Sequence, residues 1–340
     1  ALMVATKIIA PNLAGWLADH TGKSLRIIRI SSFFAAIIFA GFFHHNNYWW
    51  IAAVTVGFSF FWNIALPQFE AATLFHLKNE PHQYSKIRLW GSIGFIITVL
   101  GIGRIVDLFS IDYIPEIVIV LLTMIWLVSL ITPEAKVEIK EKESGGVFKI
   151  IKQPEILAFF VVYMLLQLAH GPYYVFYSIY LNQFDYTPTF IGLLWALGVC
   201  AEVVLFIFMK QILAWVSLRN ILLISIVLSI CRWLIIAFYV ESAPLMIFAQ
   251  VLHAATFGSS HVVAIHLVHK YFGEFHQGKG QALYSSLSFG LGGMIGSLYS
   301  GYFWDIYGPG FVYSMAAVSC FFAFVIAFIW VGRENRTLLS

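Results

Sequence analysis

The chain has 340 residues, of which 60% are hydrophobic and 11% are charged, and its formal net charge is +3. Soluble domains carry about 25% charged residues, so this composition, with a mean hydropathy of +0.84, indicates an integral membrane protein. The basic residues are dispersed among loops, which argues against nucleic acid as a partner, and the three cysteines all fall inside apolar runs, which argues against disulfides and a zinc site.

Pro, Gly and charged residues divide the apolar runs into eleven predicted spans. A helix crosses the hydrocarbon core with about 20 apolar residues, and these runs are long and unalternated, unlike the strands of a membrane barrel. The predicted spans are 1–18, 27–44, 48–75, 87–108, 113–131, 155–181, 189–210, 219–240, 244–268, 280–303 and 311–331. The sequence begins inside an apolar segment at Ala1. We therefore expect an all-α membrane protein whose first helix precedes this sequence.

The connections between the spans alternate in charge. With the loop 19–26 placed inside, every second connection carries Lys or Arg, whereas the opposite ones, such as HHNNYWW (44–50) and VESAP (240–244), carry neither. The positive-inside rule therefore predicts a cytoplasmic central loop and C-terminus. We expect a multi-pass protein of the cell inner (cytoplasmic) membrane.

One long hydrophilic stretch, 132–154, separates the first five spans from the last six. We interpret it as a cytoplasmic linker between two half-bundles. The predicted domains are 1–131, an N-terminal half-bundle lacking its first helix, the linker, 155–331, a C-terminal half-bundle, and 332–340, a cytoplasmic tail.

An internal repeat supports two related halves. LAGWLADHTGKSLRIIRIS (13–31) is echoed by ILAWVSLRNILLIS (212–225), and RLWGSIGF (88–95) more weakly by ALYSSLSF (282–289). Parallel repeats related by an axis along the membrane normal are an architecture of secondary transporters.

The loop GWLADHTGKSLR (15–26) resembles the signature G-x-L-A-D-x-x-G-[RK] of the major facilitator superfamily. The resemblance implies two six-helix half-bundles and an inner-face gate to which Asp19 and Gly15 contribute. Gly15 and Gly22 would permit close packing and a tight turn. A solvated loop rich in Gly and Lys is the alternative, but it would not require Asp at that spacing.

Four further segments resemble the 3-phenylpropionate permease group of this superfamily, which is related to the lactose permease type of proton symporter. They are YSKIRLWGSIGFI (84–96), GLLWALGVCAEVVLF (192–206), LLISIVLSICRW (222–233) and QVLHAATFGSSH (250–261). The match runs in order along nearly the whole chain. It is less specific for the substrate, because the wider group carries aromatic acids, sugars or nucleosides.

Glu70 and Arg88 lie on either side of a short predicted cytoplasmic turn, 18 residues apart. In the lactose permease type, a Glu and an Arg at this spacing hold the substrate, so the resemblance implies the same role here. The alternative is a helix-end pair whose charged ends reach into water at the membrane surface.

Glu202 and Arg232 are charged groups in the middle of apolar spans, where charge is costly and usually functional. The resemblance makes Glu202 a substrate contact, and a buried carboxylate also suits a proton carrier. Arg232 is a candidate ligand for a substrate carboxylate, which arginine binds in a bidentate manner. A structural salt bridge between the two residues is the alternative.

His170, His253 and His261 supply groups that titrate between pH 5 and 8, so we list them with Glu202 as candidates for proton coupling. His253 matches the histidine of the lactose permease type, but the carboxylate that follows three residues later in that type is Thr256 here. A histidine on an apolar helix is more often a hydrogen-bonded structural group. Their spacing is not that of metal ligands.

Aromatic and small residues complete the candidate features. Tyr173 and Tyr174, in HGPYYVFYSIY (170–180), could stack on a planar substrate or could serve helix packing. Ser288, Gly292, Gly296 and Ser300 form a small-xxx-small face that we interpret as helix packing.

The sequence thus favours a monomeric secondary transporter that needs no cofactor and is not an enzyme. The first hypothesis is proton-coupled uptake of an aromatic monocarboxylate such as 3-phenylpropionate by alternating access. The alternative is a proton symporter for a sugar or nucleoside, with Glu70 and Glu202 accepting hydroxyl hydrogen bonds. An intramembrane enzyme or a channel is a weaker alternative. Substrate, protons and the lipid bilayer are the expected partners.

Overall fold

The computed structural model describes residues 2–77, 84–133 and 150–332, and it omits the side chains of a few residues within the helices, including Asp19 and Arg88. The chain divides into two compact units, Ala1–Glu143 and Ser144–Ser340. Most of the predicted linker, 132–154, and nearly all of the predicted tail, 332–340, lie outside the described residues, so these boundaries stay predictions.

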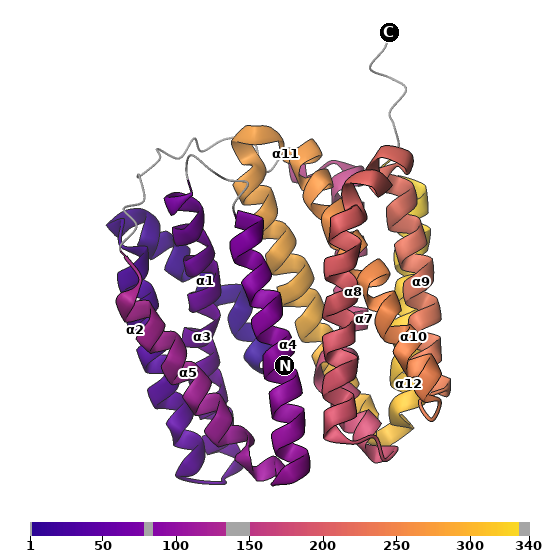
Figure 1. The fold of residues 1–340 in the computed structure, drawn as a ribbon. Coiled ribbons are helices and arrows are strands. Elements are labelled where there is room, and N and C mark those ends of the chain that lie inside the picture. The colour runs from indigo at the N-terminus through magenta and orange to yellow at the C-terminus, as the bar shows by residue number, and fades with distance from the viewer. Residues whose placement is uncertain (1, 78–83, 134–149, 333–340) are drawn as a thin grey trace. The chain divides into compact units, whose positions relative to one another are not determined.

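The described residues of the N-terminal unit form five long helices and two short 3-10 turns, and Figure 1 shows how the helices are arranged. Helix α3 packs against α1 and α2, and α2 packs against α5. Gly22 takes φ +65° in the turn between α1 and α2, as predicted for a tight turn. The elements are α1 (Leu2–Thr21), α2 (Ser24–Phe39), η1 (Ala40–Phe43), α3 (Tyr48–His76), α4 (Tyr84–Leu108), η3 (Ile111–Tyr113) and α5 (Ile114–Ile131).

Two helices of the C-terminal unit are interrupted by glycines with positive φ. Gly273 takes φ +61° within α11, and Gly308 takes φ +79° within α12, directly before Pro309. A residue with a side chain rarely adopts this region, so both glycines mark turns. The elements are α7 (Pro154–Gln183), α8 (Pro188–Trp215), α9 (Leu218–Phe238), α10 (Ala243–His253), η4 (Ala254–Gly258), α11 (Ser259–Ser285), η5 (Ser286–Gly292) and α12 (Gly293–Trp330).

Local sequence determines where helices α7, α8 and α9 begin. Thr187 and Ser217 cap α8 and α9, accepting hydrogen bonds from the backbone N–H groups of Phe190 and Asn220. Such caps satisfy N–H groups that have no partner within the helix. Pro154 and Pro188 occupy first-turn positions, where proline is favoured because no N–H is lost.

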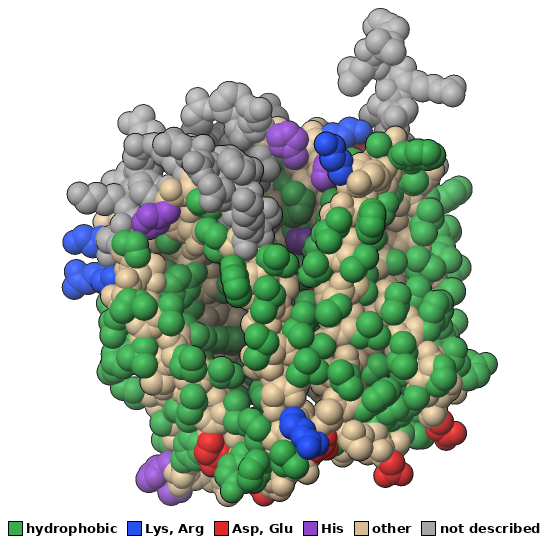
Figure 2. Space-filling model, viewed as in Figure 1, with side chains coloured by type: hydrophobic (Ala, Val, Ile, Leu, Met, Phe, Trp, Pro, Cys, Tyr) green, Lys and Arg blue, Asp and Glu red, His purple; other side chains and the backbone are tan. Residues whose placement is uncertain are grey.

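The described helices account for the eleven predicted spans. Among the described residues, nine stretches are long and apolar enough to cross a membrane. The last of them, Lys279–Trp330, is divided by the turn at Gly308 and corresponds to two predicted spans. Leu2–Ala18 is a shorter apolar helix and corresponds to the first predicted span. Figure 2 shows hydrophobic side chains along the helical faces in view, with charged side chains mainly at the helix ends. The prediction of an all-α membrane protein is confirmed for the described residues.

Glycines bring α7 and the η5–α12 segment into backbone contact. A Cβ added to Gly171 would overlap the backbone of Gly296, and one added to Gly292 would overlap the carbonyl of Met164. The predicted packing role of the small-residue face is therefore confirmed. Gly15 differs, because a Cβ there would meet no heavy atom of the described residues within 4 Å. The close packing expected at Gly15 therefore stays a prediction.

An arginine caps the last described helix of each unit. Arg29 donates hydrogen bonds of 3.0 Å to the carbonyl oxygens of Ser129 and Thr132 at the end of α5. Arg219 donates one of 2.7 Å to the carbonyl of Val331 at the end of α12. These carbonyls have no partner within their own helix, and a cation complements the helix dipole there.

Candidate functional site

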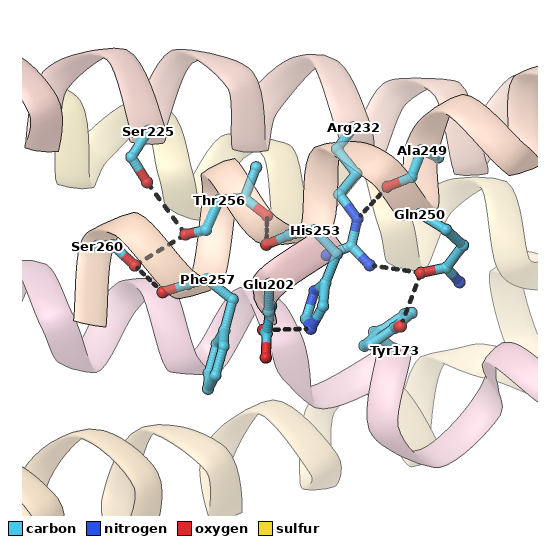
Figure 3. A network of polar contacts seen from close by, with 10 residues as sticks. All are labelled: Tyr173, Glu202, Ser225, Arg232, Ala249, Gln250, His253, Thr256, Phe257 and Ser260. Carbon is cyan, nitrogen blue, oxygen red and sulfur yellow. Dashed lines mark hydrogen bonds and ion pairs between the residues drawn. The ribbon is translucent and has the colours of Figure 1, made fainter. Parts of the chain in front are cut away.

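Arg232 lies at the centre of a polar network within the C-terminal unit (Figure 3). Its side chain has no exposed surface. Its Nε donates a 2.9 Å hydrogen bond to the carbonyl of Ala249. Its guanidinium carbon lies 4.4 Å from the ring centre of Tyr173 and 4.6 Å from that of Trp233. Aromatic faces attract a cation, so the rings stabilise a charge that does not face an open cavity in this conformation.

Gln250 joins Arg232 to Tyr173. Its Oε1 accepts a 3.0 Å hydrogen bond from the hydroxyl of Tyr173 and a 3.5 Å one from Nη2 of Arg232. The three side chains come from α10, α7 and α9. The amide therefore connects three helices at one point.

Glu202 and His253 form the second part of the network. Oε1 of Glu202, on α8, lies 3.1 Å from Nε2 of His253, at the end of α10, and the side chains are 16% and 9% exposed. This contact follows from the packing of α8 against α10 and η4. The sequence offers a salt bridge between Glu202 and Arg232 as the alternative, whereas the hydrogen bonds of Arg232 described above go to Ala249 and Gln250.

A π-helical turn, η4, follows His253 and changes the register of the span. Eight residues of regular α-helix would place His253 and His261 about 80° apart. A π-turn contains more residues per turn, so it takes up part of that rotation. The rings of His253, Phe257 and His261 consequently lie nearly parallel, at centroid separations of 5.3 and 6.2 Å.

Serines satisfy the backbone of this turn. The carbonyl of Thr256 accepts hydrogen bonds from the hydroxyls of Ser225, at 3.0 Å, and Ser260, at 2.8 Å. A carbonyl released from the regular helical pattern needs such partners when it is buried. Beyond the turn, Nδ1 of His261 lies 3.0 Å from the hydroxyl of Tyr284.

His170 lies beside the network on α7. Its side chain is buried, and its Nδ1 is 2.8 Å from the carbonyl of Leu166. Because a carbonyl only accepts, Nδ1 carries a hydrogen there, and in the neutral ring Nε2 is an acceptor. The ring lies 4.9 Å from that of Trp233 and 6.2 Å from that of His253.

The two candidate tyrosines have different surroundings. Tyr173 is 1% exposed and contacts the rings of Trp195, at 4.6 Å, and His253, at 5.5 Å. Tyr174 is 50% exposed, although its ring lies 5.4 Å from that of Tyr173. Tyr173 thus belongs to the network, and Tyr174 lies at its edge.

The remaining candidates belong to the N-terminal unit. Glu70 lies near the end of α3, and the side chains of Arg88 and Asp19 lie outside the described residues. The pairing of Glu70 with Arg88 and the gating role of Asp19 and Gly15 therefore stay predictions. Across residues 2–77, 84–133 and 150–332, no group of three or more His, Cys, Asp or Glu is placed to hold a metal ion.

Sequence reasoning missed Gln250, Trp195 and Trp233. The signal for Gln250 was its polarity within an apolar span and its position three residues before His253, which places both on one helical face. The two tryptophans were not distinguishable from ordinary membrane aromatics, because their partners come from other helices.

Membrane-spanning helices that bury an arginine and a carboxylate–histidine pair are typical of membrane transporters. Residues 1–315 match the MFS_1 like family, and the chain belongs to that family. Its relatives and structural neighbours are transporters of the major facilitator type, so it is a multi-pass membrane transporter and not an enzyme.

Among its relatives, the chain is 28% identical over 332 residues to a probable 3-phenylpropionic acid transporter of Escherichia coli (strain K12), covering 94% of this chain and 83% of that protein. It is 22% identical to a maltose permease of Geobacillus stearothermophilus, covering 96% and 83%. Among solved structures, it resembles the nucleoside transporter NupG in its D323A mutant, with a TM-score of 0.84, 19% identity and coverage of 97% and 89%. This likeness confirms the major facilitator fold.

Proposed function

We propose that this transporter takes up a small aromatic monocarboxylate such as 3-phenylpropionate together with a proton. The observation that carries this proposal is Arg232, a permanent cation that lies over the rings of both Tyr173 and Trp233. A cation and aromatic faces together suit a ligand that has a carboxylate and a planar ring. The relative described as a probable 3-phenylpropionic acid transporter supports the same substrate class.

The Glu202–His253 pair is the proposed site of proton coupling. A carboxylate and an imidazole 3.1 Å apart can share a proton, and histidine changes charge near physiological pH. Gln250 lies on α10 three residues before His253 and contacts Arg232. A proton on the Glu202–His253 pair and a substrate carboxylate at Arg232 would therefore both change the charge of one connected network. This shared network would couple movement of the proton to movement of the substrate.

The other predicted residues enter the proposal in supporting roles. Tyr174 would add a ring at the edge of the site, and His170 and His261 would be further proton acceptors. Glu70 and Arg88 would contribute from the N-terminal unit, with Asp19 and Gly15 in an inner gate.

Transport would proceed by alternating access, in which the two halves move against each other, as is typical of this class. The transporter would act as a monomer in the cell inner membrane, with the central loop and C-terminus in the cytoplasm.

A proton symporter for a sugar or nucleoside is the second candidate. The 16% exposure of the Glu202 side chain leaves a carboxylate that could accept a hydrogen bond from a hydroxyl group. The relative described as a maltose permease is consistent with this alternative.

Counterflow in reconstituted vesicles separates the two candidates. Vesicles loaded with unlabelled 3-phenylpropionate, maltose or uridine are diluted into labelled 3-phenylpropionate. We expect transient accumulation only when the loaded solute is the aromatic acid. If labelled maltose or uridine shows counterflow and labelled 3-phenylpropionate does not, the second proposal replaces the first.

A further inference from the structure

Gln250 is a fully buried amide whose orientation is fixed by its neighbours. Both groups that contact its Oε1, the hydroxyl of Tyr173 and Nη2 of Arg232, donate hydrogen bonds to it. A guanidinium has no acceptor, so the reversed amide would place donor against donor. The network therefore assigns the oxygen to this side, and Figure 3 shows the amide nitrogen turned away from both partners.

Two hydrogen-bond donors of the network, one on Gln250 and one on Arg232, have no partner among the described residues. These donors, Nε2 of Gln250 and Nη1 of Arg232, are both buried. The carbonyl of Ala249 already accepts a hydrogen bond from Arg232, and Oε1 of Gln250 already accepts two. Buried donors without partners are costly, and an acceptor-only group such as a carboxylate complements them.

The charge at residue 250 matters as much as its hydrogen bonds. A glutamate here could accept the same two hydrogen bonds, but it would form an ion pair with Arg232 and cancel the positive charge. Glutamine holds Arg232 and Tyr173 in place while leaving the guanidinium charge uncompensated by residue 250.

We propose that Gln250 is a specificity-determining residue, which orients Arg232 and Tyr173 and preserves the positive charge that selects an anionic substrate over its neutral analogue. This inference rests on the proposed function, and it adds a residue and a basis of selection to it. The space for the amide comes from Gly198 on α8, where an added Cβ would lie 3.3 Å from Oε1 of Gln250.

The test compares binding of 3-phenylpropionate with binding of its uncharged analogue, 3-phenylpropionamide, by calorimetry on the full-length chain in nanodiscs. The wild type is expected to prefer the acid. Gln250→Glu should lower the acid-over-amide preference by at least about tenfold, since it weakens a charge-assisted hydrogen bond between Arg232 and the substrate carboxylate. Gln183→Glu, the same change at an exposed site on α7, should leave the preference unchanged.

Gln250→Met removes the hydrogen bonds without adding a charge. We expect it to weaken binding of the acid more than binding of the amide, but to lower the preference less than Gln250→Glu does. Thermal unfolding of each variant reports its fold, and Gln250→Met alone carries the test if Gln250→Glu does not fold.

Three outcomes would overturn the inference. A wild type that binds the acid, with variants whose acid-over-amide preference is unchanged, would refute the role of Gln250 alone. Equal loss of acid and amide binding would assign Gln250 a purely structural role. A wild type that does not bind the acid would refute the proposed substrate class and this inference with it.

Discussion

A carboxylate oxygen of Glu202 lies 3.1 Å from an imidazole nitrogen of His253, among the packed helices of the C-terminal unit. The carboxylate comes from α8, and the histidine is the last residue of α10, directly before the π-turn η4. Because Nε2 faces Glu202, the second ring nitrogen, Nδ1, is the one without a hydrogen-bond partner among the described residues. A change of protonation there alters the charge of the pair without breaking the contact.

Glu202→Gln tests the coupling role of this pair. Glutamine keeps a hydrogen-bond acceptor for His253 but cannot carry the transported proton. We expect accumulation of substrate against a gradient to fall by about tenfold or more, because the substitution removes an acid–base group. Exchange of labelled for unlabelled substrate should continue. The measurement is uptake and exchange in vesicles with an imposed pH gradient. Unchanged accumulation would exclude Glu202 as the proton carrier.

Arg232→Ala and Arg232→Lys test the substrate cation. Alanine removes the charge, so we expect binding of 3-phenylpropionate to fall by at least about tenfold. Lysine keeps a charge but not the planar donor group that packs against Tyr173 and Trp233, so the affinity of Arg232→Lys should be intermediate. Arg104→Ala, at an exposed position of α4, is the matched control. Wild-type affinity in folded Arg232→Ala would remove Arg232 from the site.

Gly171→Ala tests the backbone contact between α7 and α12. The added methyl group would overlap the backbone of Gly296, so we expect a loss of about 1–3 kcal/mol in the free energy of unfolding. Gly301→Ala is the control, because a Cβ there meets no heavy atom of the described residues within 4 Å. Thermal unfolding of the two variants in the same detergent gives the comparison. Equal stabilities would contradict the contact.

Arg29→Ala tests the cap at the end of α5. The variant loses two hydrogen bonds to the carbonyls of Ser129 and Thr132 and a favourable charge at the helix end. We expect a loss of about 1–2 kcal/mol in unfolding free energy. Arg26→Ala removes an exposed arginine from the same helix and should have little effect. A larger loss in Arg26→Ala than in Arg29→Ala would refute the capping role.

The fold was predictable because long apolar runs leave the chain few alternatives. Backbone groups in lipid must be paired within the chain, so a run of about 20 apolar residues forms a helix. The breaks were also readable, as at Gly308 and Pro309, where a left-handed glycine and a proline end one span and begin the next.

The candidate site was only partly predictable, because its contacts join helices that are distant in sequence. Glu202, Arg232 and His253 were identified from their charge or polarity in apolar spans. Their partners were not, since the choice of His253 over Arg232 for Glu202 depends on how α8 packs against α10. The parallel rings of His253 and His261 depend on a π-turn, which regular helical spacing does not predict.

Proton movement during downhill substrate flow tests the central claim most directly. Purified protein is reconstituted into weakly buffered vesicles without an imposed pH gradient, and the external pH is recorded when 3-phenylpropionate is added. The signal of protein-free vesicles is subtracted, because the neutral acid crosses bilayers unaided. The proposal predicts external alkalinisation as the anion and a proton enter together, and no alkalinisation with Glu202→Gln even though labelled substrate still exchanges. Saturable entry of 3-phenylpropionate through the wild type without any pH change would contradict it.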